Sequence, residues 1–285
     1  MASAAKTILV TGTSSGIGLA TIKLFHSKGW NVIATMRNPS KAPADLKELQ
    51  PQDRVLVTRL DVTEWDSIEP AIKEGIAKFG KIDVLVNNAG YGQNGLFEAI
   101  SREKMRAQFD VNVFGVMDVT RAILPHFRAN QNGGIVNIST GTGFWSLPTS
   151  TPYSASKFAL EGFTESLSYE AASQGVFVKS VIPHGGITGN NFVQRYAAEM
   201  PGSTSDHGLQ DYDKFLAKTT ESFKKMIGGA ATSSDEVAAK VYEAVTDGTD
   251  RLRYFIGNDA RGFLKARYNS KDDEEYMTYM RSFFK

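Results

Sequence analysis

Short runs of aliphatic residues alternate with longer helical patterns along roughly the first 190 residues of the chain. Most of these runs are bounded by Gly, Asn or Asp, which is typical of strands that end in turns. Strands that alternate with helices favour a parallel sheet covered by helices on both faces. We therefore predict a doubly wound α/β fold in a single domain, residues 1–285. The expected strands are Ile8–Val10, Asn31–Ala34, Val55–Leu60, Val84–Asn87, Ile135–Ile138, Phe177–Ile182 and Tyr254–Gly257, and the expected helices are Ile17–Lys28, Trp65–Phe79, Arg102–Ala129 and Tyr153–Ser173.

The sequence changes character after Pro183. Residues 184–208 are rich in Gly and polar side chains, which predicts a long, mobile connection. Long connections of this kind often cover a substrate site, so residues 188–225 are expected to act as a lid. Helical patterns resume near Asp211.

The C-terminal part contains two further helix signals. The run Ser233-Ser-Asp-Glu236 is a capping box, which predicts a helix from there to about Thr246. Residues 258–285 form a C-terminal extension. Its end, residues 272–285, has acidic residues first and then aromatic residues at helical spacing, which predicts a short amphipathic helix that packs on an apolar surface.

Charge and composition exclude several classes of function. The formal net charge is +1, so no strong field is present that would attract nucleic acid or an acidic membrane. The chain has no Cys, which excludes disulfides, thiolate catalysis and cysteine-based metal centres, and no other metal site is expected. The N-terminus is too short and polar for a signal peptide, and no stretch approaches the ~20 apolar residues of a membrane span. We expect a soluble, cytoplasmic protein.

The segment Thr11-Gly-Thr-Ser-Ser-Gly-Ile-Gly18 follows the first expected strand and opens the first expected helix. A pyrophosphate needs backbone N–H groups directed at it and no Cβ in the way, and glycines at a helix N-terminus meet both needs. Ordinary tight turns also contain such glycines, but the strand–turn–helix context favours dinucleotide binding. The expected cofactor contacts are Gly12, Ser14, Ser15, Gly16, Ile17 and Gly18.

The end of the second expected strand indicates which dinucleotide binds. An acidic residue at this place would bind the free ribose 2′-hydroxyl of NAD. This chain has Met36 there, followed by Arg37. No carboxylate repels a 2′-phosphate and a guanidinium is available to pair with it, so NADP(H) is the expected cofactor. The alternative is that Arg37 is only a solvated side chain.

The run Tyr153-Ser-Ala-Ser-Lys157 begins an expected helix directly after Pro152. The i, i+4 spacing places Tyr153 and Lys157 on one helix face. A free Tyr has a pKa near ~10, and a neighbouring cation favours the phenolate and lowers that pKa. Tyr153 is then able to give a proton to a nascent alkoxide or to take one from an alcohol. The same spacing is common on solvated helix faces, and the Gly-rich turn upstream is what favours a catalytic pair.

These motifs, in this order, resemble those of the short-chain dehydrogenase/reductase family from Thr7 to about Thr188. The resemblance implies a Rossmann-type sheet and an NADP(H)-dependent oxidoreductase. It also implies a homodimer or homotetramer that pairs the helix of Tyr153 and the long helix after Asn94. The shared marks are Thr11-Gly-x-x-x-Gly-x-Gly18, Asp61, Asn87-Asn-Ala-Gly90, Asn112, a hydroxyl segment before Phe144, and Tyr153-x-x-x-Lys157.

The resemblance also implies roles for single residues. Asp61, followed by Val62, would contact the adenine, and a local cap for the next helix is the alternative for Asp61. Asn112 would hold a water molecule that connects Lys157 to solvent, and a buried Asn satisfied by the backbone is the alternative. The other implied cofactor residues are Asn87, Asn88, Ala89, Gly90, Pro183, Ile187 and Thr188.

Two positions depart from the family pattern. The catalytic Ser of the family usually lies thirteen residues before the Tyr, and this count reaches Thr140, one residue after Ser139. A Thr hydroxyl also donates to a carbonyl oxygen. Alternation along a strand directs neighbouring side chains to opposite sides, so we expect Thr140 rather than Ser139 to serve. The second departure is His184, in place of the usual Gly after Pro183, for which the family provides no role.

The leading interpretation is reduction of a ketone or aldehyde, or the reverse oxidation of a secondary alcohol. Tyr153 would act as general acid or base, assisted by Lys157, Asn112 and Thr140. An alternative is a non-catalytic NADP(H) sensor or scaffold, and a third possibility is an isomerase or cyclase on the same fold. The candidate pocket residues are mostly apolar or aromatic, which favours a hydrophobic small-molecule substrate: Tyr91, Asn94, Phe144, Trp145, Leu147, Phe192 and Tyr196.

Overall fold

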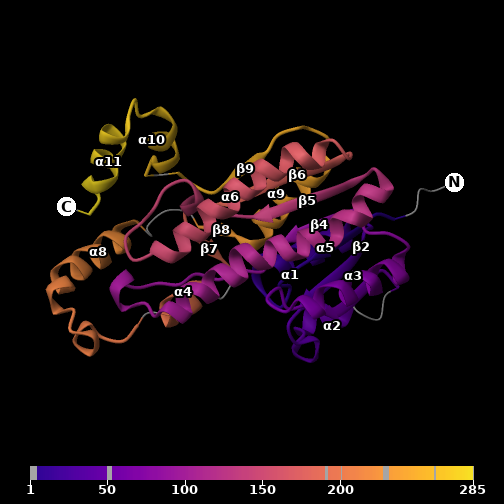
Figure 1. The fold of residues 1–285 in the computed structure, drawn as a ribbon, viewed down its shortest axis with the longest axis horizontal. Helices are drawn as coiled ribbons and strands as arrows, with labels where there is room; N and C mark the ends of the chain where they lie inside the picture. Colours follow the sequence, from indigo (N-terminus) through magenta and orange to yellow (C-terminus); the bar gives the residue numbers. More distant parts are fainter. Residues whose placement is uncertain are drawn as a thin grey trace.

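The computed structural model describes residues 5–49, 53–189, 192–199, 201–226, 231–259 and 261–284. Its centre is a seven-stranded sheet in the order β3-β2-β1-β4-β5-β6-β9, in which every neighbouring pair is parallel (Figure 1). The strand order reverses between β1 and β4, and ligands of doubly wound folds bind beyond the carboxyl ends of the strands at such a point. The strands are β1 (Thr7–Val10), β2 (Asn31–Met36), β3 (Val55–Arg59), β4 (Val84–Asn87), β5 (Gly133–Ile138), β6 (Val176–Pro183) and β9 (Arg253–Ile256).

Alternate side chains of the strands enter two separate hydrophobic cores. Ile8 and Val10 of β1 belong to one core, and Leu9 between them belongs to the other. Both faces of the sheet are therefore buried, which explains why the strands are continuous apolar runs in the sequence. The predicted doubly wound α/β fold is confirmed. The first core is covered by α1 (Gly16–Ser27), α2 (Ala44–Leu49) and α9 (Ser234–Thr246), and the second by α3 (Trp65–Phe79), α5 (Gly115–Asn130) and α6 (Thr151–Ala172).

Each expected strand is present, with bounds within two residues of the predicted ones. The helix expected over residues 102–129 is present but is not one regular helix. After α4 (Arg102–Phe109), the backbone forms a π-helical turn at Asp110–Phe114 before α5 begins. A π-helical turn shifts the pattern by a single residue, which is too small a change for hydrophobic periodicity to reveal.

The connection after β6 is more helical than expected. It contains α7 (Phe192–Ala198), a helix that the sequence pattern did not indicate, while α8 (Asp213–Met226) agrees with the helical pattern near Asp211. A short parallel pair, β7 (Ile187–Thr188) with β8 (Thr232–Ser233), ties the beginning of this segment to its end. Residues 190, 191 and 200 of the expected lid lie outside the described residues.

The capping box predicted for α9 is confirmed. The hydroxyl of Ser233 accepts from the backbone N–H of Glu236 at 3.1 Å, and the Glu236 carboxylate accepts from the Ser233 N–H at 2.7 Å. These two bonds satisfy N–H groups that have no partner within the helix, and they fix the residue at which the helix begins.

The C-terminal extension forms two helices, α10 (Phe263–Asn269) and α11 (Asp273–Ser282). Tyr276 and Met280 of α11 are buried in a third hydrophobic core, as the spacing of apolar residues in the tail predicts. Figure 1 shows α10 and α11 at the same end of the sheet as α8. Within the ranges described above, no helix is both long and apolar enough to cross a membrane.

Candidate active site

The Gly-rich turn joins the end of β1 to the start of α1, and close packing requires its glycines. Gly12 and Gly16 have φ angles of +71° and +58°, in the left-handed region that favours Gly. A Cβ on Gly12 would lie 2.8 Å from Cα of Ala89, and one on Gly18 would lie 2.5 Å from Nδ2 of Asn88. Both distances are shorter than a normal contact, so a side chain at either position would displace the neighbouring loop.

Asn88 fastens the loop after β4 to this turn. Its Nδ2 donates to the backbone oxygens of Thr11 at 2.8 Å and Gly12 at 3.0 Å. In return, the Thr11 hydroxyl accepts from the backbone N–H groups of Asn88 and Ala89, each at 3.0 Å. The role of Thr11 was missed by the sequence reasoning, although a Thr directly before the first Gly of the turn is a signal for it. The structure thus brings the predicted residues after β4 against the Gly-rich turn.

The outer side of the turn is open to solvent. Ser14 and Ser15 are exposed, and Ser15, the N-cap residue of α1, makes no side-chain capping hydrogen bond. The first N–H groups of a helix carry partial positive charge, so this end of α1 is able to receive a phosphate. Arg37, directly after β2, is also exposed and forms no ion pair within the described part of the chain. Its guanidinium is available to a second phosphate.

Asp61 and Val62 have local structural partners after β3. The Asp61 Oδ1 accepts from the backbone N–H of Thr63 at 3.0 Å and from its hydroxyl at 2.8 Å. The side chain of Val62 is buried against Gly115 at the start of α5. Asp61 therefore closes a turn before α3 and does not cap that helix, whose N-cap residue is Glu64, and the turn uses one of the two carboxylate oxygens.

Tyr153 lies in the first turn of α6, and 8% of the residue is exposed. The hydroxyls of Thr140 and Thr142 lie near its phenol and favour the phenolate, although that of Thr142 forms no hydrogen bond among the described residues. Burial has the larger effect and raises the pKa of Tyr153 well above its ordinary value. The expectation that this pKa is lowered overall is therefore wrong, because removal of the ring from water outweighs the groups that favour ionisation. Burial therefore favours the neutral phenol over the phenolate.

Thr140 and Ser139 are directed to different surroundings. Ser139 continues the β5 ladder, with its backbone N–H donating to the oxygen of Val181 at 2.9 Å. Its hydroxyl is buried beside Gly143 and has no hydrogen-bond partner among the described residues. Thr140 is the hydroxyl that the structure brings to Tyr153. The second hydroxyl, that of Thr142, was missed by the sequence reasoning, although its place in Thr140-Gly-Thr142 is a signal.

Lys157 is buried one helical turn after Tyr153. Its Nζ donates to the backbone oxygen of Ile138, at the end of β5, at 2.9 Å. Burial lowers the pKa of Lys157 to about 8, and the carboxylate of Glu161 offsets part of this effect. The lysine therefore carries a positive charge at neutral pH and loses it in mildly alkaline solution.

Asn112 lies in the π-helical turn and is buried. Its Nδ2 donates to the backbone oxygen of Tyr91 at 2.9 Å and to the hydroxyl of Ser156 at 3.2 Å, while its Oδ1 accepts from the Tyr91 N–H at 3.2 Å. The backbone-satisfied Asn considered as an alternative is therefore present. The amide also joins the loop after β4 to α6 at the residue before Lys157.

Two aromatic rings of α7 cover Tyr153. The ring centroids of Phe192 and Tyr196 lie 5.6 and 6.3 Å from that of Tyr153, and the two rings stack on each other at 5.8 Å. Gly92 makes room for them, because a Cβ there would lie 2.7 Å from the Tyr196 ring. The Tyr196 hydroxyl is hydrogen-bonded to the hydroxyl of Ser150. The segment expected to be a lid thus lies over the candidate catalytic tyrosine.

Polar contacts fasten the other end of α7. The amide Nε2 of Gln93 donates to the backbone oxygen of Glu199 at 2.6 Å, and Lys104 forms an ion pair with the Glu199 carboxylate at 3.2 Å. Gln93 is fully buried, and its own backbone N–H donates to Oε1 of Gln108 at 2.6 Å. The sequence reasoning missed these residues, because nothing local relates residue 93 to residue 199.

The other pocket candidates divide between the site and the C-terminal core. Phe144, Trp145 and Leu147 pack with α10 and α11, so they belong to a hydrophobic core rather than to an open pocket. His184 is buried in edge contact with Trp145 at 5.9 Å, and burial lowers its pKa. The remaining predicted residues lie in or beside loops at the carboxyl edge of the sheet: Asn87, Gly90, Tyr91 and Asn94 at β4, and Pro183, Ile187 and Thr188 at β6 and β7.

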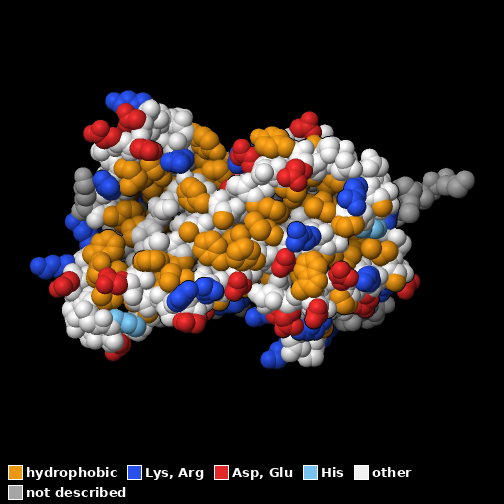
Figure 2. All heavy atoms as spheres, in the orientation of Figure 1, with side chains coloured by type: hydrophobic (Ala, Val, Ile, Leu, Met, Phe, Trp, Pro, Cys, Tyr) orange, Lys and Arg blue, Asp and Glu red, His pale blue; other side chains and the backbone are white. Residues whose placement is uncertain are grey.

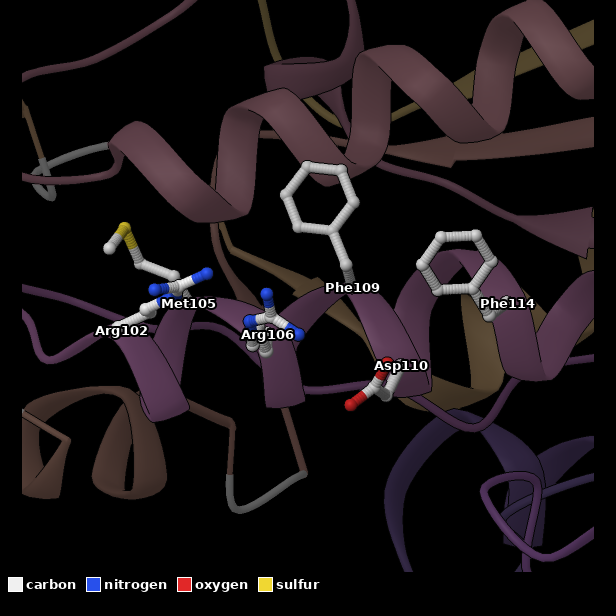
Figure 3. Close-up of a pocket in the computed structure, with 6 residues that line it drawn as sticks. All are labelled: Arg102, Met105, Arg106, Phe109, Asp110 and Phe114. Atoms are coloured by element: carbon white, nitrogen blue, oxygen red, sulfur yellow. The ribbon is translucent and has the colours of Figure 1, made fainter.

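A shallow surface pocket lies along α4 and the π-helical turn (Figure 3). It contains none of the residues that surround Tyr153 or the Gly-rich turn, so it is separate from the candidate active site. Its lining residues are Arg102, Met105, Arg106, Phe109, Asp110 and Phe114.

Comparisons with known proteins identify the family. The family model for the short chain dehydrogenase matches residues 6–199. An uncharacterized oxidoreductase of Bacillus subtilis is 36% identical over 258 residues, which cover 88% of this chain and 89% of that protein. Retinol dehydrogenase 8 of Bos taurus is 33% identical over 261 residues, 89% of this chain and 82% of that one. The crystal structure of a short-chain dehydrogenase from Streptomyces avermitilis has a TM-score of 0.80 and 32% identity, covering 98% of this chain and 99% of that one. This chain therefore belongs to the short-chain dehydrogenase/reductase family of NAD(P)-dependent oxidoreductases.

Proposed function

We propose that this oxidoreductase uses NADPH to reduce a ketone or aldehyde, and in reverse uses NADP⁺ to oxidise a secondary alcohol. The observation that carries the proposal is the buried phenol of Tyr153, faced by the Thr140 hydroxyl, with Lys157 one helical turn away. Reduction needs an acid at the oxygen where negative charge develops, and burial keeps this phenol protonated.

The residues around the Gly-rich turn fit an NADP(H) molecule. Gly12 and Gly18 admit no Cβ, and the exposed N-terminus of α1 is suited to a pyrophosphate. The exposed guanidinium of Arg37 is suited to a 2′-phosphate. A serine dehydrogenase crystallised with NADP⁺ is 25% identical to this chain, with a TM-score of 0.73 and coverage of 89% of this chain and 95% of that one. When bound, the nicotinamide supplies or accepts the hydride.

The residues of this chain then have distinct tasks. Tyr153 gives its phenolic proton to the carbonyl oxygen of the substrate as that oxygen gains negative charge. The hydroxyl of Thr140 donates to the same oxygen and orients it. Lys157, with a pKa of about 8, is positively charged at neutral pH and stabilises the phenolate that remains on Tyr153. Asn112 holds α6 in place through its bond to Ser156. The rings of α7 exclude water from these groups.

We infer that the substrate is apolar near its carbonyl group. The stacked rings of Phe192 and Tyr196 cover Tyr153, and aromatic faces of this kind favour apolar or aromatic ligands. Two relatives are named for substrates of such character. One is the retinol dehydrogenase of Bos taurus already mentioned, and the other is a 3-ketodihydrosphingosine reductase of Bacteroides thetaiotaomicron, 36% identical over 73% of this chain and 72% of that protein.

We further propose a homodimer or homotetramer formed through α4, α5 and α6. Large hydrophobic side chains are exposed along this face, with Phe114 at 54%, Phe158 at 38% and Tyr169 at 73%. Figure 2 shows hydrophobic side chains gathered over these helices. Such patches are rare on monomers and are covered when subunits pair. Light scattering should give a mass of two or four chains, and Phe114→Glu should reduce it.

The proposed activity is tested by following NADPH or NADH oxidation with a panel of aryl, steroid-like and long-chain ketones. We expect turnover of at least one apolar ketone, with kcat/KM for NADPH higher than for NADH by about tenfold or more. Tyr153→Phe should lower kcat by about 10³-fold while NADPH binding is retained. Tight NADPH binding without turnover of any carbonyl compound would favour the sensor alternative.

A further inference from the structure

A buried carboxylate with no part in the proposed reaction lies one helical turn beyond Lys157. Glu161 is 5% exposed. It follows Lys157 by four residues on α6, so the two side chains lie on the same face of the helix. A buried carboxylate is costly unless it is paired and hydrogen-bonded, so the partners of Glu161 are informative.

Two strands supply these partners. The Glu161 Oε1 accepts from the hydroxyl of Ser180 in β6 at 2.6 Å, and its Oε2 accepts from Nε of Arg253 in β9 at 3.0 Å. The guanidinium of Arg253 also donates to Glu165, four residues further along α6. The Glu165 side chain is 45% exposed, whereas that of Glu161 is 6% exposed. Arg253 therefore joins a buried carboxylate to an exposed one.

Charges alternate along this face of α6. The order is Lys157 (positive), Glu161 (negative), Arg253 (positive) and Glu165 (negative), from the candidate active site toward solvent. The Glu161 carboxylate lies between two cations, and its charge favours the protonated form of Lys157. Arg253 reduces the effect of Glu161 on Lys157, because its positive charge is paired with the same carboxylate.

The same carboxylate also lies against the turn that follows Thr140. A Cβ on Gly143 would lie 3.2 Å from Cγ of Glu161 and 3.2 Å from the backbone oxygen of Lys157. The Arg253 guanidinium lies 5.3 Å from the centre of the Phe144 ring, the residue after Gly143. The pair therefore contacts both the helix of Lys157 and the turn of the candidate catalytic hydroxyls.

Few other charged groups of the described residues face Lys157. Its own helix provides Tyr153 and Glu161, while β5 provides the neutral carbonyl of Ile138. The π-helical turn contributes the neutral amide of Asn112, which donates to the hydroxyl of Ser156, the residue before Lys157. Arg253 is the charged group behind Glu161 on the strand side. The ionisation of Lys157 therefore depends mainly on burial and on this carboxylate.

We propose that Glu161 and Arg253 form a positioning pair that sets the ionisation of Lys157 and holds α6 against the turn after Thr140. Neither residue is expected to touch the substrate or the cofactor. The inference rests on the proposed function only for the role that it assigns to Lys157.

The ionisation of Lys157 can be measured without any enzyme assay. Competitive acetylation of the folded protein across a pH series, with mass spectrometry of the Lys157 peptide, gives the midpoint at which its amine becomes reactive. We expect Glu161→Gln to lower this midpoint by about one pH unit, because a neighbouring negative charge is removed. Arg253→Gln is expected to raise it, because the competing cation is removed. The pair of variants thus predicts shifts of opposite sign.

Glu165→Gln is the matched control, because it removes the other carboxylate of Arg253 at an exposed site. Its midpoint and its kcat/KM should stay within about twofold of the wild-type values. Glu161→Gln should lower kcat/KM for ketone reduction by about tenfold and move the alkaline limb of its pH profile in the same direction as the acetylation midpoint. If Glu161→Gln does not fold, the upward shift in Arg253→Gln decides the question.

Unchanged acetylation midpoints in the variants that fold would overturn the inference and leave an ordinary buried ion pair. A wild-type protein without ketone turnover would contradict the proposed function instead. The two failures are distinguishable, because acetylation requires neither cofactor nor substrate.

Discussion

The hydroxyl of Thr140 faces the phenol of Tyr153, while the hydroxyl of the adjacent Ser139 is buried beside Gly143. Thr140 and Tyr153 come from different elements, since Thr140 follows β5 and Tyr153 lies in the first turn of α6. Their proximity places a Thr where the family resemblance implies a Ser, with a methyl group that stiffens χ1 and narrows the space beside the phenol.

The two hydroxyls should respond differently to truncation. We expect Thr140→Ala to lower kcat/KM for ketone reduction by about 10²-fold, as for the loss of one donor to a developing oxyanion. Ser139→Ala should remain within about threefold of wild type, because its hydroxyl makes no contact with the phenol. Thr140→Ser, which keeps the donor, is the matched control. Steady-state kinetics with one ketone suffice, and full activity of Thr140→Ala would refute the assignment.

The ionisation of Lys157 predicts an alkaline limit for reduction. Because its pKa is about 8, kcat/KM should be nearly constant around neutral pH and should fall above about pH 8 as the stabilising charge is lost. Tyr153 stays protonated through this range, since burial raises its pKa. The pH profile of Lys157→Met should be low and should lack this limb. A limb that persists unchanged in Lys157→Met would have to be assigned to another group.

The buried charge of Lys157 should also lower the stability of the fold. Its pKa is lowered from 10.5 to about 8, so the unfolded chain binds more protons than the folded chain between these values, and the free energy of unfolding rises with pH across this window. At pH 7 both states are protonated and the full cost of the buried charge is present. We expect the free energy of unfolding of Lys157→Met to exceed that of the wild type by about 2 kcal/mol at pH 7. The difference should shrink as the pH approaches 10.5. Urea denaturation at neutral and alkaline pH provides the comparison, and a destabilised Lys157→Met would contradict this prediction.

Arg37 should determine the choice between the two nicotinamide cofactors. Arg37→Ala removes the only guanidinium placed directly after β2, and we expect kcat/KM for NADPH to fall by about tenfold or more while the value for NADH is unchanged. Lys73→Ala, at an exposed cation on α3, controls for the general loss of positive charge. Equal decreases in kcat/KM for NADPH and NADH would show that Arg37 does not bind the 2′-phosphate.

Gly92 should be required for α7 to cover the site. A Cβ at Gly92 would lie 2.7 Å from the ring of Tyr196 and 2.9 Å from that of Phe192, so Gly92→Ala should displace α7. We expect KM for the ketone to rise by about tenfold, with NADPH binding measured by fluorescence unchanged. Gly162→Ala is the matched control, because a Cβ there meets no atom within 4 Å in the middle of α6. Gly162→Ala should raise the free energy of unfolding by about 0.5–1 kcal/mol and should not change kcat or KM. An unchanged KM in Gly92→Ala would show that α7 is not a lid.

The motifs that depend on neighbouring residues could be predicted from the sequence. Continuous apolar runs between helical patterns predicted the strands, because both sheet faces are buried and require such runs. The capping box at Ser233, the Gly-rich turn and the spacing of Tyr153 and Lys157 are local patterns as well, since their chemistry depends on offsets of a few residues. The choice of Thr140 over Ser139 came instead from the spacing that the family resemblance implies, together with the alternation of side chains along a strand.

Contacts between distant segments were decided only by the tertiary structure. Three contacts join residues that no local pattern relates: the edge contact of Tyr196 with Tyr153, the bond from Gln93 to Glu199 and the pairing of Glu161 with Arg253. The degree of burial is also a property of the assembled fold, and it reversed the expected direction of the Tyr153 pKa shift. The sequence by itself determined which groups carry the proposed chemistry, because residue type and local spacing are properties of the sequence. The tertiary structure decided the ionisation of these groups and which side chains cover them, because desolvation depends on everything that packs around a side chain.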